Sequence, residues 1–72
     1  MHYAVVIEPS PTGFGAYVPD LPGCVAVAES EAEVRELIRE AVELHIDSLR
    51  EDGVEIPSPE TRVEYIEVRS AA

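Results

Sequence analysis

The chain has 72 residues, 15 of them acidic and 5 basic, with a formal net charge of −10 and a single cysteine. A chain of this length forms one domain that buries only roughly 60% of its unfolded surface, so it is marginal without a metal, disulfides or self-association. An internal disulfide is excluded, and the acidic balance disfavours direct binding to nucleic acid while favouring basic partners.

The first third of the chain predicts a β-hairpin. Residues 2–8, HYAVVIE, are β-branched and aromatic, which is typical of a strand. Pro9, Pro11 and Gly13 punctuate the PSPTG turn that follows, and residues 14–18, FGAYV, predict the second strand. Alternation places every second side chain of that strand on one face. These side chains are Phe14, Ala16 and Val18.

A proline- and glycine-rich loop ends the second strand. Proline removes strand hydrogen-bond donors and keeps its preceding neighbour extended, while glycine tolerates positive φ. We therefore interpret the loop as structural and not catalytic. It comprises Pro19, Asp20, Leu21, Pro22, Gly23 and Cys24. The following run from Cys24 to Ala28, CVAVA, predicts a third strand that is small on one side and valine-rich on the other.

The second half predicts one long helix and a final strand. Ser30 and Glu33 match a capping box that starts the helix, and Asp52-Gly53 ends it about five turns later. Residues 61–68, TRVEYIEV, predict the last strand. One apolar stripe recurs along the helix at spacings of three and four. It consists of Val34, Leu37, Ile38, Ala41, Val42, His45 and Leu49.

The predicted fold is α+β, in the order β-β-β-α-β, with a four-stranded, mostly antiparallel sheet and the helix on one face. The helix covers only half of the apolar strand side chains. Val6, Tyr17, Val25 and Val27 do not all share the face of their neighbours. A second apolar face that is exposed in a single chain predicts a dimer or a larger assembly.

Catalytic and metal-binding patterns are weak in this sequence. Cys24 is expected to be a small buried thiol, because nothing places His2 or His45 beside it as a base. The same three residues lack the short spacing of metal ligands. Glu8, with Asp20 and Glu64, is the best candidate for a metal-dependent nuclease, but no phosphate-binding loop or basic groove accompanies it. We expect neither catalysis nor a cofactor.

One feature of the helix stands out. Acidic residues recur at intervals of three and four on the side opposite the apolar stripe, and like charges at these spacings repel each other. A ridge that weakens its own helix suggests a docking surface, where electrostatic complementarity speeds encounter with a partner. We call this the acidic ridge. It consists of Glu33, Glu36, Glu40, Glu43 and Asp47.

Three runs carry a resemblance to a known family. They are YVPDLPGCV from Tyr17 to Val25, EAVELH within the helix, and DGVEIPSP from Asp52 to Pro59. Together they resemble the N-terminal domain of HicB-type antitoxins. The resemblance implies a partial ribonuclease-H-like fold without its nuclease chemistry. It also implies self-association, as a dimer or tetramer, and inhibition of HicA, a small basic toxin that cleaves messenger RNA.

Relatives that repress their own operon carry a further DNA-binding segment after this domain, whereas the sequence here ends at Ala72. We therefore expect a single HicB-like domain over residues 1–72. The lone cysteine and the absence of a signal-like or membrane-spanning start favour the cytoplasm. Two alternatives stay open. One is an oligomeric interaction module without a toxin, and the other is a degenerate nuclease that uses Glu8.

Overall fold

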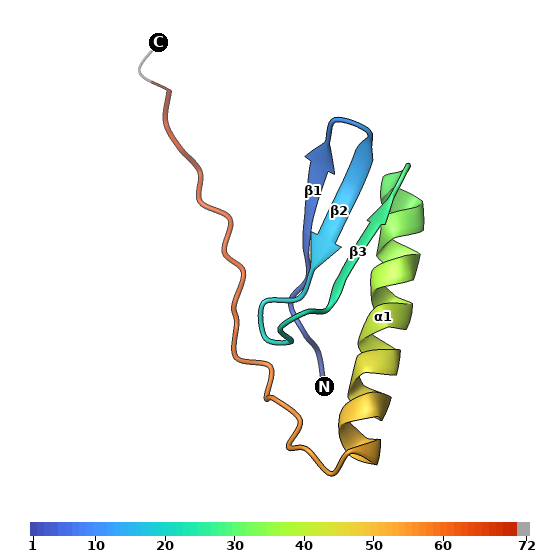
Figure 1. The fold of residues 1–72 in the computed structure, drawn as a ribbon. Coiled ribbons are helices and arrows are strands. Elements are labelled where there is room, and N and C mark those ends of the chain that lie inside the picture. Colours follow the sequence, from blue (N-terminus) through green and yellow to red (C-terminus); the bar gives the residue numbers. More distant parts are fainter. Residues whose placement is uncertain (71–72) are drawn as a thin grey trace.

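The computed structural model describes residues 1–70, so the last two residues of the predicted domain lie outside the described part. A three-stranded antiparallel sheet covers one side of a single long helix (Figure 1). The elements are β1 (Val6–Ser10), β2 (Gly13–Tyr17), β3 (Val25–Ala28) and α1 (Glu31–Glu51). The predicted α+β class, the first four elements and their order are confirmed.

The hairpin between β1 and β2 turns at Pro11-Thr12, which joins the paired residues Ser10 and Gly13. Gly13 has a steric role that the sequence does not reveal. A Cβ atom at this position would lie 2.2 Å from the carbonyl oxygen of Ala28 in the neighbouring β3. Only glycine allows β2 and β3 to approach this closely where the hairpin begins.

The core lies between the sheet and the helix. Ala16 of β2 is buried, and the half-buried alanines of β3 also face α1, as the predicted small side of that strand requires. Small strand side chains allow the helix to approach the sheet closely. Larger side chains complete the core at the end where the loop between β2 and β3 folds back. The buried residues are Ala16, Val18, Leu21, Cys24, Val34, Ile38 and Ile46.

Both predicted helix ends are confirmed. Ser30 is the N-cap, and its hydroxyl oxygen accepts the backbone N–H of Glu33 at 3.2 Å. The reciprocal bond differs in detail from a standard capping box, because the Ser30 hydroxyl donates to the Glu33 carboxylate at 3.0 Å. Asp52 is the C-cap, and Gly53 follows with φ +68°, a left-handed conformation that glycine adopts without strain.

The first strand is shifted relative to its prediction. Residues 2–8 were expected to be extended and paired, whereas β1 begins at Val6 and continues to Ser10. Val6 pairs with Tyr17, the last residue of β2. Residues 2–5 therefore have no opposing strand among residues 1–70, and their β-forming side chains alone do not make a strand.

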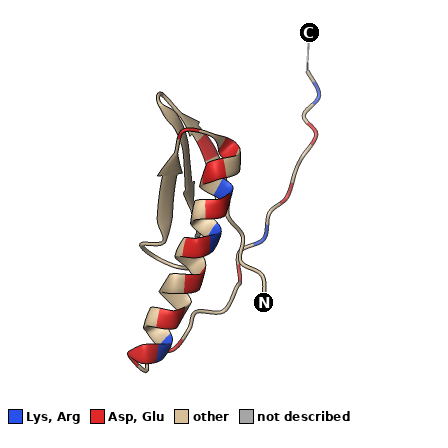
Figure 2. Ribbon diagram, turned by 90° about the vertical axis from the view of Figure 1, so that its right-hand side faces the viewer, with Lys and Arg blue, Asp and Glu red and all other residues tan. Residues whose placement is uncertain are grey.

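The predicted final strand, Thr61–Val68, is not found: residues 54–70 contain no strand. Two contacts hold the start of this tail. The Tyr3 hydroxyl donates to the carbonyl oxygen of Pro57, and Asp20 binds Glu60 and Thr61. Beyond these contacts the tail leaves the body of the domain in both ribbon views (Figures 1 and 2), so it has no edge to pair with.

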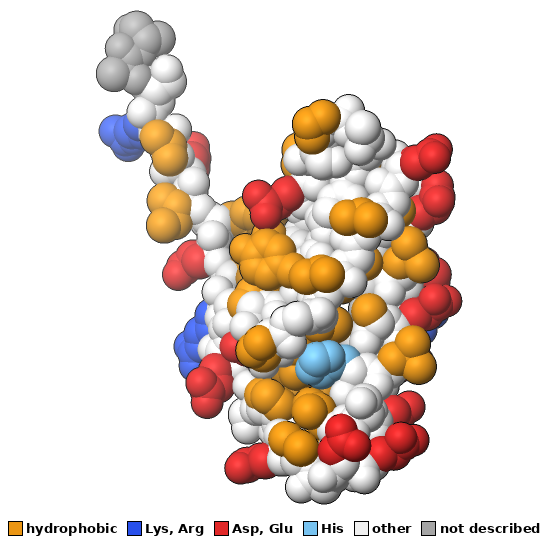
Figure 3. All heavy atoms as spheres, in the orientation of Figure 1, with side chains coloured by type: hydrophobic (Ala, Val, Ile, Leu, Met, Phe, Trp, Pro, Cys, Tyr) orange, Lys and Arg blue, Asp and Glu red, His pale blue; other side chains and the backbone are white. Residues whose placement is uncertain are grey.

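The sheet face away from the helix is open and apolar. Tyr17, Val25 and Val27 are 43%, 64% and 78% exposed. Figure 3 views this face and shows hydrophobic side chains gathered over the sheet. The predicted second apolar face is therefore present in the isolated chain.

Candidate protein-binding surface

The acidic ridge runs along the side of α1 that faces away from the sheet. Val34 and Ile38 point into the core, and the helical repeat places the ridge on the opposite side. Figure 2 shows acidic residues along the whole length of the helix, with the sheet behind it. All five ridge residues are exposed, namely Glu33, Glu36, Glu40, Glu43 and Asp47.

Arginines neutralise part of the acidic ridge. Arg39 forms ion pairs with Glu36 and with Glu43, the latter at 3.8 Å, and Arg50 lies 3.8 Å from Asp47. The hydrogen bond to Glu36, followed by the charges of Glu36 and Glu43, raises the pKa of the Arg39 guanidinium. These pairs are exposed and contribute little to stability. Among residues 1–70, Glu40 takes part in no ion pair.

The two flanks of the acidic ridge differ in chemistry. Arg35 and Arg39 lie on the flank beside β1, where they border a groove. Leu37 and Leu44 lie on the other flank, because residues seven apart on a helix point in nearly the same direction. Leu37 was predicted in the core stripe but is 43% exposed, and Leu44 is 71% exposed. Leu37 sits at the border of the stripe, where the small sheet does not reach.

Leu44 was not among the predicted site residues, although its spacing of seven residues from Leu37 indicates a shared helix face. An acidic ridge with two exposed leucines beside it combines charge with apolar area. Binding energy at protein interfaces concentrates in a few apolar or aromatic side chains, surrounded by polar contacts. The surface of α1 therefore has the composition of a protein-binding site.

The loop between β2 and β3 is held by its own backbone. The Val18 N–H donates to the Cys24 carbonyl at 3.2 Å, and Leu21 and Cys24 donate to Val18 and Leu21, both at 3.1 Å. Leu21 is completely buried, whereas Pro19 and Pro22 are exposed. Gly23 has φ +84°, in the left-handed region.

Asp20 ties this loop to the tail. Its carboxylate accepts the backbone N–H groups of Glu60 at 3.0 Å and Thr61 at 2.9 Å, and the Thr61 hydroxyl at 2.8 Å. The bonds from the Thr61 N–H and hydroxyl, with a smaller contribution from Glu60, lower the pKa of Asp20. Three donors on one carboxylate fix where the tail leaves the body.

Cys24 is 3% exposed, and burial raises the pKa of its thiol. A thiol of this kind is a poor nucleophile. Glu8 lies in β1, Asp20 accepts bonds from the tail, and Glu64 is in the tail itself. Among residues 1–70, no three His, Cys, Asp or Glu side chains form a group that could hold a metal ion.

The described residues also contain no helix that is both long and apolar enough to cross a membrane. Fold and surface together define a small α+β domain with an acidic helical face. Residues 3–70 match the family described as "HicB_like antitoxin of bacterial toxin-antitoxin system". The chain therefore belongs to this HicB-like antitoxin family, as its PDLPGC loop and capped helix indicated.

Curated relatives and a solved structure are also similar to this chain. A UPF0150 protein of Archaeoglobus fulgidus is 41% identical over 56 residues, which cover 74% of the chain and 81% of that protein. A 14.9 kDa protein encoded in the rep-hol intergenic region of Haemophilus phage HP1 is 33% identical over 66 residues. That match covers 92% of the chain, which spans half the length of the phage protein.

The solved structure is a chain of the "HicA3 and HicB3 toxin-antitoxin complex". It matches with a TM-score of 0.71 and 32% sequence identity, over 83% of the chain and 70% of that chain. Family and structure support an antitoxin role in a toxin-antitoxin system.

Proposed function

We propose that this protein binds and neutralises a small, basic HicA-type toxin that cleaves messenger RNA, and that the acidic ridge of α1 is the contact surface. The observation that carries the proposal is the continuous exposed acidic face on the side of α1 away from the sheet. A basic RNA-cleaving toxin needs its positive surface for RNA. An acidic face that covers this surface blocks the toxin directly.

Charge and apolar contact have separate roles in this proposal. The ridge attracts the toxin and speeds encounter, an effect that salt screens within about 10 Å at 0.1 M. Leu37 and Leu44 are exposed beside the ridge and supply area that leaves water on binding. We therefore expect ridge substitutions to slow association, and leucine substitutions to speed dissociation.

The test is a calorimetric or surface-binding titration of a HicA-type toxin with the parent and with the triple variant Glu36→Lys, Glu40→Lys, Glu43→Lys. The expected result is at least a hundredfold weaker affinity, with the loss mainly in the association rate. The matched control reverses Glu29, Glu55 and Glu60, which are exposed and lie outside α1. Each reversal adds two charges, so both variants carry −4.

Two single substitutions sharpen the assignment. Glu40→Lys changes the ridge charge without removing the ion-pair partner of an arginine. Leu44→Ala removes apolar area at a position that is 71% exposed and outside the core. If the triple variant and its control bind the toxin equally well, the site lies elsewhere on the protein. If the parent binds no toxin of this type, the proposed function itself fails.

We also propose that the chain self-associates, as a dimer or tetramer. The support is the open apolar face of the sheet, with Tyr17, Val25 and Val27 exposed. A domain of 72 residues has a small core of its own. Burying this apolar face between chains therefore adds substantially to its stability. Static light scattering of the purified protein measures the assembly directly, against a chain mass of 7.9 kDa.

A further inference from the structure

The tail exposes several large apolar side chains to solvent. Residues 61–69 are extended and exposed. Val63, Tyr65, Ile66 and Val68 are 59%, 94%, 79% and 84% exposed. Isolated apolar side chains are normal on a surface, but a run of this kind on one extended segment indicates an interaction site.

The apolar side chains of the tail alternate in a specific way. In an extended chain, Val63 and Tyr65 point to one side, and Ile66 and Val68 point to the other. A strand with one solvent-exposed face needs apolar side chains only on its buried face. The tail is apolar on both sides and therefore suits a position with apolar surface above and below it.

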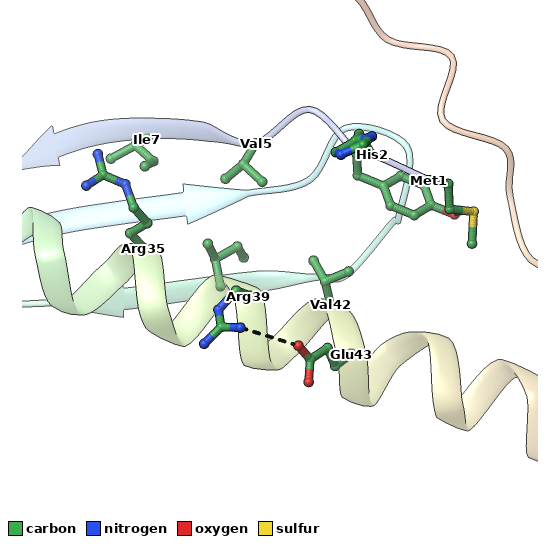
Figure 4. Close-up of a pocket in the computed structure, with 10 residues that line it drawn as sticks. Met1, His2, Val5, Ile7, Arg35, Arg39, Val42 and Glu43 are labelled. Atoms are coloured by element: carbon green, nitrogen blue, oxygen red, sulfur yellow. Dashed lines mark hydrogen bonds and ion pairs between the residues drawn. The ribbon is translucent and has the colours of Figure 1, made fainter.

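The free edge of β1 is such a position. The sheet order leaves β1 at one edge, and α1 lies mainly beneath β2 and β3. A groove of about 520 Å³ therefore opens between the start of the chain with β1 on one side and α1 on the other. Figure 4 shows Val5 and Ile7 pointing into it from above and Val42 from below. On the other face of the sheet, Val6 of β1 and its exposed partner Tyr17 of β2 provide the apolar surface next to this edge.

Among residues 1–70, two segments with strand-forming sequences have no partner strand. They are residues 2–5, which precede β1, and residues 61–68 of the tail. Backbone N–H and C=O groups at a sheet edge readily pair with an added strand. Pro9 has no N–H, so the usable part of the edge runs through the residues before it, which are also the residues that border the groove.

We infer that residues 61–69 of one chain add as a strand to the β1 edge of a second copy of this chain. One apolar side of the added strand fills the groove between β1 and α1, and the other side extends the open apolar face. In a two-fold dimer each chain gives its tail and receives its partner's. The inference deepens the self-association proposed above and is independent of toxin binding.

Two observations favour a second copy over other occupants. The three hydrogen bonds at Asp20 direct the tail away from the body of its own chain (Figures 1 and 2), which places it within reach of a neighbour. The groove is lined mainly by apolar side chains, and its two arginines are already paired with glutamates, so it offers apolar area and no net charge to a basic toxin. Residues 61–70 contain two arginines and two glutamates, so the tail approaches an acidic chain as a neutral segment.

The first experiment is light scattering on the parent and on two proline variants, Glu64→Pro and Tyr65→Pro. Adjacent residues of a strand direct their N–H groups to opposite edges, so one of the two variants must remove a pairing donor. We expect that variant to raise the dissociation constant of the assembly about tenfold or more. Glu64→Ala and Tyr65→Ala are the matched controls. Far-ultraviolet circular dichroism checks that each variant keeps its fold.

The second experiment identifies whose edge the tail contacts. A photo-reactive benzoylphenylalanine replaces Tyr65, and equal amounts of ¹⁵N-labelled and unlabelled chains are mixed before irradiation. Mass spectrometry then locates the cross-links. Pairing with a second copy gives cross-links between the tail and residues 1–8 or α1 that join labelled to unlabelled peptides. The same probe at Glu29, an exposed position far from the tail in sequence, is the control.

The outcomes separate the two proposals. A mass of 7.9 kDa at all concentrations overturns both self-association and strand exchange. A larger mass that neither proline variant changes leaves self-association standing and overturns the exchange. Cross-links confined to peptides with the same label overturn it as well, because they place the tail on its own β1.

Discussion

The body of the domain and its tail are built from similar sequences but have different structures. Residues 14–18 and residues 61–68 both alternate β-forming side chains, yet residues 14–17 are paired on both edges and residues 61–68 on neither. β2 has one face against the helix, where Ala16 is buried. The tail has no such surface. Alternation determines which side chains share a face, and the partner determines whether a strand forms.

The largest expected effect is the difference in stability loss between two isoleucine-to-alanine substitutions, one in the body of the domain and one in its tail. Ile38→Ala removes a core side chain that is 2% exposed, and it should cost about 3 kcal/mol of unfolding free energy. Ile66→Ala removes the same atoms from a position that is 79% exposed, and it should cost less than about 0.5 kcal/mol. Urea unfolding at low protein concentration measures both. Equal losses would mean that the tail packs on the body of a single chain.

A smaller effect compares two glycines of the body, one with a steric and a conformational requirement and one with a conformational requirement alone. Gly13→Ala places a Cβ 2.2 Å from a backbone oxygen of β3, so the strands must separate, at a cost of about 2 kcal/mol. Gly23→Ala meets no atom within 4 Å and has only its φ of +84° to oppose it, at a cost of about 1 kcal/mol.

Thermal unfolding ranks these two variants, and Gly23→Asn is the control because asparagine tolerates this conformation better than other residues. A loss at Gly23 larger than that at Gly13 would show that the turn, and not the approach of β2 to β3, limits the fold.

Local signals in the sequence were sufficient for the first four elements. The Ser30 cap, the Asp52-Gly53 stop and the small side of the third strand each depend on neighbouring residues only, and each is found in the structure. The requirement at Gly13 depends on Ala28, which is distant in sequence, and therefore could not be predicted from the turn.

The same reasoning applies to the surface. The sequence predicted where the acidic ridge lies on the helix, since helical spacing alone determines that position. It did not reveal that Arg39 joins Glu36 and Glu43, nor that Leu37 lies beyond the reach of the sheet. The ion pairs depend on side-chain rotamers, and the exposure of Leu37 depends on how far the sheet extends over the helix.

The smallest expected effect concerns the junction between body and tail. The hydrogen bonds from Thr61 and Glu60 lower the pKa of Asp20 in the folded state below its ordinary value of 3.8. The unfolded chain therefore binds a proton at Asp20 more readily than the folded chain. The anchoring contribution is fully present above the ordinary pKa and is lost as the pH falls through the lowered value.

Amide hydrogen exchange of Glu60 and Thr61 measures this anchor, because both N–H groups bind the Asp20 carboxylate. Asp20→Asn keeps the shape of the side chain but removes its charge, so protection of these two amides should fall, while amides in the middle of α1 keep theirs. Spectra recorded from pH 6 down to pH 3 should show the parent approaching the variant at the acid end. Unchanged protection in the variant would mean that the tail is held by the contact between Tyr3 and Pro57 alone.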